Sequence, residues 1–320
     1  MGTSERKTIF NFTSEEGVLR TSIAVTLFLA AIGIAFGLAS GSFSIAFDGV
    51  YSLVDASMSG LSLMVVRLIT SYTTATQISR RMRERFTMGF WHLEPMVLTL
   101  NGILLASVAI YALINAVSSL LEGGRDLAFD LAMIYAVVTV SVCVAIAVVE
   151  TRANRHIGSD FLRMDISGWV MSASITTALL IAFAIGFCVQ GSQWQWISPY
   201  IDPAVLAVVC LVIIPMPLSA VRQAMADIFL VTPADFKRHV DGVAQTIVAK
   251  HGFVSYRAYV AKVGRSREIE LYFIVPPTTE ARTIQEWDAL REEVSQAVGG
   301  AGPDRWLTVV FTGDAEWAEC

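Results

Sequence analysis

Six long apolar segments dominate the sequence and limit the folds that this chain can adopt. They cover residues 18–38, 43–69, 91–121, 127–150, 166–190 and 200–222. A helix of about 20 mostly apolar residues is long enough to cross the hydrocarbon core of a bilayer. Of all residues, 54% are hydrophobic and only 16% are charged, which is too apolar for an ordinary soluble domain. We therefore expect a bundle of six transmembrane helices and exclude a secreted or cytosolic protein.

Basic residues gather in the loops after the second and the fourth segment, whereas the opposite loops contain only Arg125. The clustered residues are Arg80, Arg81, Arg83, Arg85, Arg152, Arg155 and Arg163. Cytoplasmic loops carry the excess of Lys and Arg in membrane proteins, and an even number of spans returns the chain to the side where it began. Both termini are therefore predicted to be cytoplasmic. Because no transit peptide is evident, we expect the plasma membrane, most simply the inner membrane of a bacterium.

The pattern changes after Pro233 from long apolar runs to short amphipathic pieces. The expected elements are a helix over 234–251, strands over 253–263 and 267–276, a helix over 283–298 and a strand over 305–312. Polar and apolar residues alternate through the second strand, as in a half-buried strand. The sequence thus predicts an N-terminal segment (1–17), a six-helix α transmembrane domain (18–222) and an α+β cytoplasmic domain (223–320). A domain of this size would gain from a partner subunit that covers its sheet.

Small residues recur along the first apolar segment at four-residue spacing. Gly33, Gly37 and Gly41 lie on one face of the expected helix, where small residues allow a neighbouring helix to approach closely. We expect this face to pack within the chain rather than to form a dimer contact.

Ionisable residues inside the hydrocarbon region are costly and mark functional sites. The second segment contains Asp48, Tyr51 and Asp55. Spacings of three and four residues place all three on one helix face, along about 10 Å of the axis at about 1.5 Å per residue. Asp55 lies near the middle of the predicted span and Asp48 nearer its outer end. Asp55 is therefore the strongest candidate for a functional carboxylate.

The fifth segment presents Asp165, Gly168 and Ser172 at the same spacings. Two antiparallel helices with these faces would build one oxygen-rich patch around Asp55. Carboxylate, phenol and hydroxyl oxygens suit a hard cation, whereas an empty site favours a protonated carboxyl because burial disfavours its charged form. Cation binding and proton release are then coupled, which is the chemistry that a proton antiporter needs.

The stretch from Ser42 to Ala56, SFSIAFDGVYSLVDA, resembles the second helix of the cation diffusion facilitators. Other similar positions are His92, Leu93, Glu94 and Pro95 before the third helix, Asn101-Gly102 within it and Asp202-Pro203 opening the sixth. The resemblance covers nearly the whole chain. It implies a ferredoxin-like tail, a homodimer closed partly by that tail, and export of divalent metal cations against inward protons.

The central site departs from the family pattern. Carried over by position, Asp55 matches the second ligand of the second helix, and Tyr51 stands where the family usually has His or Asp. On the fifth helix the two ligand positions hold Gly168 and Ser172, while Asp48 and Asp165 lie one turn away. A zinc site of His and carboxylate ligands cannot be assembled from these residues. The expected metal ligands are Asp55, Tyr51, Asp48, Asp165 and Ser172, with Mn, Fe, Co or Mg favoured over zinc.

Two hypotheses follow from these observations. The first is a cation/proton antiporter whose outer and inner stations are Asp48 and Asp165. The alternative is a transport-inactive binding or regulatory membrane protein on the same scaffold, which Gly168 and Ser172 would suit. An enzyme is not expected, because no nucleophile-base pair or phosphate-binding loop is evident, and no cofactor is expected beyond the transported metal. A net charge of −5 without a basic stripe argues against nucleic acid as a partner.

Overall fold

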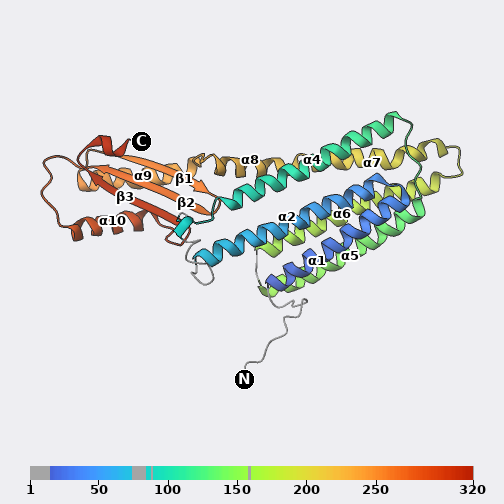
Figure 1. Ribbon diagram of the computed structural model, residues 1–320, viewed down its shortest axis with the longest axis horizontal. Helices are drawn as coiled ribbons and strands as arrows, with labels where there is room; N and C mark the ends of the chain where they lie inside the picture. Colours follow the sequence, from blue (N-terminus) through green and yellow to red (C-terminus); the bar gives the residue numbers. More distant parts are fainter. Residues whose placement is uncertain (1–14, 74–83, 88, 158–159, 320) are drawn as a thin grey trace, which may run out of the picture. The chain divides into compact units, whose positions relative to one another are not determined.

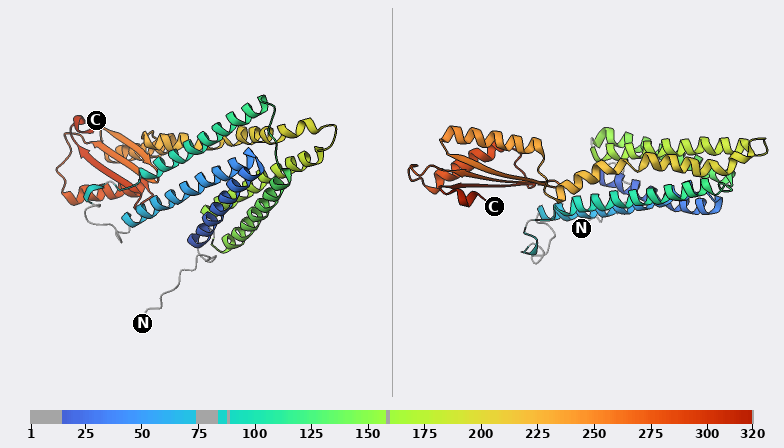
Figure 2. Two further views of the ribbon diagram at one scale, coloured as in Figure 1. Left: turned by 45° about the vertical axis from the view of Figure 1, so that its right-hand side comes forward. Right: turned by 90° about the horizontal axis from the view of Figure 1, so that it is seen from above.

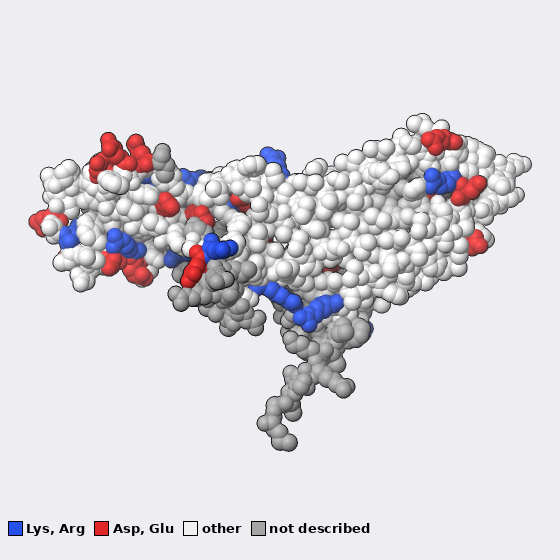
Figure 3. All heavy atoms as spheres, in the orientation of Figure 1, with Lys and Arg blue, Asp and Glu red and all other residues white. Residues whose placement is uncertain are grey.

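A computed structural model describes residues 15–73, 84–87, 89–157 and 160–319 (Figure 1). Within these residues, six apolar helical spans are long enough to cross a membrane, with mean hydropathy between 1.5 and 2.6. Large apolar side chains such as Leu38, Tyr111 and Leu121 are exposed along them, and Figure 3 shows that the visible sides of these helices carry few charged residues. Apolar surface of this extent requires lipid around it. The prediction of an integral membrane protein with six helical spans is confirmed.

The membrane helices agree with the predicted segments except at the sixth. Their bounds are α1 (Glu15–Ser40), α2 (Phe43–Thr73), α4 (Leu93–Leu121), α5 (Phe129–Ile157), α6 (Asp160–Val189), α7 (Ser198–Ile213) and α8 (Met216–Ile228). The sixth predicted segment, 200–222, lies within one apolar span, Gln195–Ile228, whose helix is interrupted between α7 and α8. The break falls at Pro215, whose nitrogen cannot donate the hydrogen bond that would continue α7 into α8. The short helix η1 (Gln195–Ile197) precedes α7.

Helices α1 and α2 pack at backbone distance because their contact positions are glycines and alanine. A Cβ atom added to Gly33 would lie 2.9 Å from Cα of Gly49, and one added to Gly37 would lie 2.5 Å from the nitrogen of Ala46. The predicted packing of this glycine face within the chain is therefore observed. Its consequence is that α2 and its acidic residues are held tightly against α1.

The N-terminus of α2 is capped by a residue from a distant part of the sequence. The buried carboxylate of Asp202, on α7, accepts a hydrogen bond from Ser42 Oγ at 2.6 Å and another from the Phe43 backbone N–H at 3.0 Å. The first N–H groups of a helix have no partner within it and favour a negative charge nearby. Asp202 thus fixes where α2 begins, one turn before Asp48.

The C-terminal region is an α+β fold. Its elements are α9 (Ala234–His251), β1 (Ser255–Val263), β2 (Ser266–Ile274), α10 (Ile284–Val298), β3 (Arg305–Thr312) and η2 (Ala315–Ala318). The sheet order is β1-β2-β3, with β2 antiparallel to β1 and parallel to β3. Figures 1 and 2 show α9 and α10 on one face of this sheet. Buried Val240, Val294 and Leu271 belong to the shared core, so the predicted α+β class is confirmed.

Contacts divide the chain into two compact units that differ from the predicted domains. One comprises residues 1–61 and 101–219, and the other comprises residues 62–100 and 220–320. Within the second unit, Arg265 in the β1–β2 turn donates a hydrogen bond from Nε to Glu94 Oε1 at 2.9 Å. Lys262 pairs with Asp227 at 3.3 Å. The α+β elements are therefore tied to the N-terminus of α4 and to α8, and the predicted boundary at residue 222 stays a prediction.

Candidate metal site

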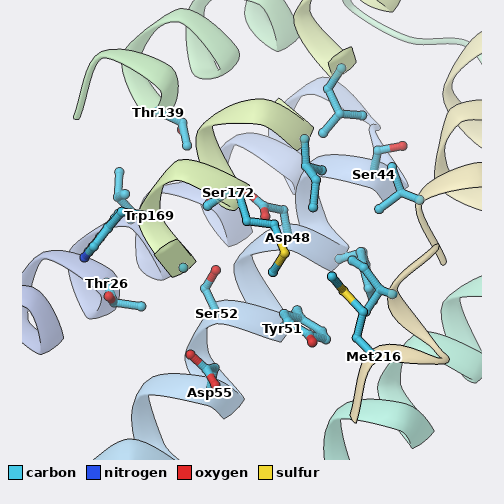
Figure 4. A pocket seen from close by; sticks show the side chains of 18 of the residues that line it. Thr26, Ser44, Asp48, Tyr51, Ser52, Asp55, Thr139, Trp169, Ser172 and Met216 are labelled. Atoms are coloured by element: carbon cyan, nitrogen blue, oxygen red, sulfur yellow. The ribbon is translucent and has the colours of Figure 1, made fainter. Parts of the chain in front are cut away.

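One cavity of about 240 Å³ lies within the first unit, and it is lined by residues from α1, α2, α5, α6 and α7 together with Met216. All five predicted metal ligands are in its wall, namely Asp48, Tyr51, Asp55, Asp165 and Ser172. Figure 4 shows the α2 residues on successive turns of that helix and Ser172 on α6. The structure thus brings together residues that are more than 100 positions apart in the sequence.

The α2 side of the cavity carries the predicted i, i+3 and i+4 spacing. Tyr51 is half-buried, and its ring packs against Phe47 with 5.6 Å between the ring centroids. The Tyr51 phenol and the carboxyl group of Asp165 both lie within electrostatic range of Asp55. Asp55 therefore has a phenol group on its own helix and a second carboxyl group on α6 as electrostatic neighbours.

Asp48 has a partner that the sequence did not predict. Tyr135 on α5 is buried, and its Oη donates a hydrogen bond of 2.6 Å to Asp48 Oδ2. The glycine contact between α1 and α2 makes room for this bond, because a Cβ on Gly33 would lie 3.0 Å from the same Oη atom. Hydrogen bonds to charged groups are stronger than neutral ones. One oxygen of Asp48 is therefore held in the cavity wall by α5.

The α6 side offers fewer ligands but has free space. Asp165 Oδ2 is buried and has no hydrogen-bond partner among the described residues. The Ser172 hydroxyl lies 3.8 Å from Cys143 Sγ. At Gly168 an added Cβ would meet no other atom within 4 Å, so a larger side chain could be placed there. The glycine at this usual ligand position is not imposed by packing.

The groups that line the cavity supply mainly oxygen atoms as metal ligands. Among the described residues, no three His, Cys, Asp or Glu side chains converge as a preformed metal site. A metal ion would therefore need the oxygens of Tyr51 and Ser172, or water, to complete the coordination around Asp55. Mn²⁺ and Mg²⁺ accept oxygen ligands of this kind, whereas structural zinc sites use Cys and His in tetrahedral geometry.

A further acidic residue lies beside this site and was not among the predicted ligands. Glu150 on α5 is only 2% exposed and faces Asp165. The fourth predicted segment ends at residue 150, where a charged side chain would be interfacial. Because α5 continues to Ile157, Glu150 lies inside the helix. No signal in the sequence indicated this burial, because Glu150 stands at the end of the apolar run.

Comparison with protein families gives a match over most of the membrane region. The model of the cation efflux transmembrane domain matches residues 19–229. The chain belongs to the cation efflux family. This result confirms the resemblance to cation diffusion facilitators, which was based on α2 and on short motifs elsewhere. Comparison with curated proteins finds no match.

Membership of the cation efflux family places the protein among the transporters of divalent metal cations rather than among enzymes. The match covers α1 to α8, and therefore includes every residue that lines the cavity. The α+β elements from Ala234 onward lie outside it. The cavity is therefore a metal-site candidate on two grounds, the family match and the oxygen atoms of its lining.

Proposed function

We propose that this cation efflux protein exports a divalent cation other than zinc from the cytoplasm in exchange for protons. The observation that carries the proposal is that Asp55, Tyr51 and Ser172 line one cavity together with two further carboxyl groups, those of Asp48 and Asp165. Asp55 is the main ligand and the proton carrier, and Tyr51 and Ser172 are neutral oxygen ligands. Release of the cation leaves buried carboxylates that favour protonation. Binding of the next cation then requires these carboxyl groups to release their protons.

The proposal includes the orientation and assembly expected from the sequence. Both termini face the cytoplasm of a bacterium-like cell, as the arginine distribution predicts. Trp194 and Trp196 are exposed beside η1, which suits an aromatic belt at the outer interface. The protein acts as a homodimer. In support, the sheet face opposite α9 and α10 includes the exposed Trp306.

The test is proton flux in liposomes that contain the purified protein. Manganese, iron(II), cobalt, magnesium and zinc are applied one at a time as inward or outward gradients, and a pH-sensitive dye reports proton movement. We expect flux with at least one of the first four ions, and we expect Asp55→Asn to abolish it. Asp130→Asn is the matched control, because Asp130 is exposed in the first turn of α5.

Two results would contradict the proposal. Zinc as the best substrate would refute the metal preference. A folded wild-type protein that moves no cation under any gradient would favour the alternative, a binding or regulatory membrane protein on the same scaffold. The specific observation behind that alternative is the lack, in the described part of the chain, of three converging His, Cys, Asp or Glu side chains.

A further inference from the structure

Glu150 is a buried acidic residue to which the proposed transport cycle gives no role. The Glu150 side chain is 2% exposed, and it lies on α5 inside a membrane span. Neither Oε1 nor Oε2 has a hydrogen-bond partner among the described residues. A carboxyl group in this setting is removed from water, which makes its charged form costly inside a membrane span. Such a group is therefore a candidate for a functional site.

Three polar groups face the Glu150 carboxyl group. They belong to Asp165 and Trp169 on α6 and to Ser22 on α1. The Trp169 indole N–H donates a 2.9 Å hydrogen bond to Ser22 Oγ, which fixes the hydroxyl oxygen and the ring. Asp165 adds Oδ2, which is also buried without a partner. Three unpartnered carboxylate oxygens and one oriented hydroxyl therefore gather where α1, α5 and α6 meet.

None of the ion pairs found among the described residues includes Glu150 or Asp165. Packing alone does not explain the arrangement, since an amide or apolar side chain would fill the same space without an unpaired charge. A divalent cation would neutralise both carboxylates and use their free oxygens as ligands.

We propose that Glu150, Asp165 and Ser22 form a second cation site, adjacent to the cavity, for a divalent ion that prefers oxygen ligands. Asp165 links the two sites, because it lines the cavity while it faces Glu150. Glu150 does not line the cavity, so the second site lies behind the α6 wall. That the bound ion then moves to Asp55 rests on the proposed transport function, but binding itself does not.

The experiment uses Mn²⁺ as the probe and the purified full-length protein in detergent. Asp55→Asn serves as the parent, because it removes the main ligand of the cavity. Equilibrium dialysis measures Mn²⁺ binding, and tryptophan fluorescence reports the site, since paramagnetic Mn²⁺ beside Trp169 quenches its emission. Parallel titrations with Trp169→Phe isolate the signal of this tryptophan from that of the other tryptophans.

We expect the Asp55→Asn parent to keep saturable Mn²⁺ binding and quenching of Trp169. Adding Glu150→Gln should weaken this binding by at least about tenfold, since even changes around metal ligands cost about 10–100-fold in affinity. Asp130→Asn, an exposed acidic residue of the same helix, should leave it unchanged. Without Mn²⁺, Glu150→Gln should melt no lower than its parent, because the amide removes an unpaired charge.

Equal Mn²⁺ affinity with and without Glu150→Gln would overturn the second site, as would quenching that survives in Trp169→Phe. If Glu150→Gln fails to fold, Ser22→Ala makes the same test, because Ser22 does not line the cavity. Failure of the transport proposal has a different signature. Wild-type protein would then move no ion in liposomes, although the Glu150-dependent binding of Mn²⁺ in detergent persisted.

Discussion

Replacing Gly37 by alanine tests whether the backbone contact between α1 and α2 holds the cavity together. The added Cβ would lie 2.5, 2.6 and 2.7 Å from N, Cα and Cβ of Ala46, whereas non-bonded carbons prefer about 3.5–4.0 Å. The two helices must therefore separate by roughly 1 Å. Overpacking of this kind costs about 1–3 kcal/mol, and the helix propensity of alanine returns about 0.5–1 kcal/mol. Because backbone atoms cannot move aside as a side chain can, we take the upper end of this range, about 3 kcal/mol, and expect a net loss of about 2 kcal/mol.

The assay is thermal unfolding of the purified protein in detergent, with Gly60→Ala as the matched control. Gly60 lies in the middle of α2, and a Cβ there would meet nothing within 4 Å. The same substitution should therefore stabilise at Gly60 by about 0.4–1 kcal/mol and destabilise at Gly37. A displaced α2 should also reduce cation flux in Gly37→Ala alone. Equal melting temperatures for the two variants, or a Gly37→Ala protein as stable as the wild type, would refute the contact.

Three further predictions concern other parts of the protein. Asp202→Ala removes two hydrogen bonds from the start of α2, and at about 1.5–3 kcal/mol for each bond to a charged group it should lower the melting temperature clearly; an unchanged value would contradict the cap. Ser172→Asp should raise zinc affinity in isothermal titration, because it places a carboxylate opposite Asp55, and unchanged affinity would count against the ligand position. In the tail, the hydrogen bond from the Lys250 ammonium lowers the pKa of the Glu293 carboxyl. The resulting stability is present above the unfolded pKa of about 4.3 and is lost as the pH falls through the lower folded value. The protection of α10 amides against hydrogen exchange, measured relative to the intrinsic exchange rate at each pH, should therefore fall below about pH 4 in the wild type and fall less in Glu293→Gln.

Local sequence pattern was enough to predict most of the fold. Apolar runs of membrane length gave the six spans, and the predicted helix over 234–251 and strand over 305–312 coincide with α9 and β3. The sixth span is also present, and its helix is interrupted between α7 and α8, where Pro215 cannot donate a backbone hydrogen bond. The loop over 74–83 and the arginines within it lie outside the described residues.

The shape of the candidate site was predictable only along each helix. Helical spacing placed Asp48, Tyr51 and Asp55 on one face, and all three do line the cavity. The same reasoning could not find Tyr135, because its bond to Asp48 depends on how α5 packs against α1 and α2. The glycine spacing predicts a close approach along one face of α1, but it does not specify which helix approaches or which side chains then meet.

Glu150 shows why burial cannot be assigned from a predicted helix end. A charged residue at the last position of an apolar run is expected to reach the interface and so to need no explanation. In the structure, α5 continues to Ile157 and α6 begins at Asp160, so Glu150 is enclosed by a second helix before the chain leaves the bundle. Asp165, near the start of α6, faces Glu150, and the two residues form a pair of carboxyl groups. A charge near the end of a span is therefore a candidate ligand whenever the next span brings a second charge to the same level.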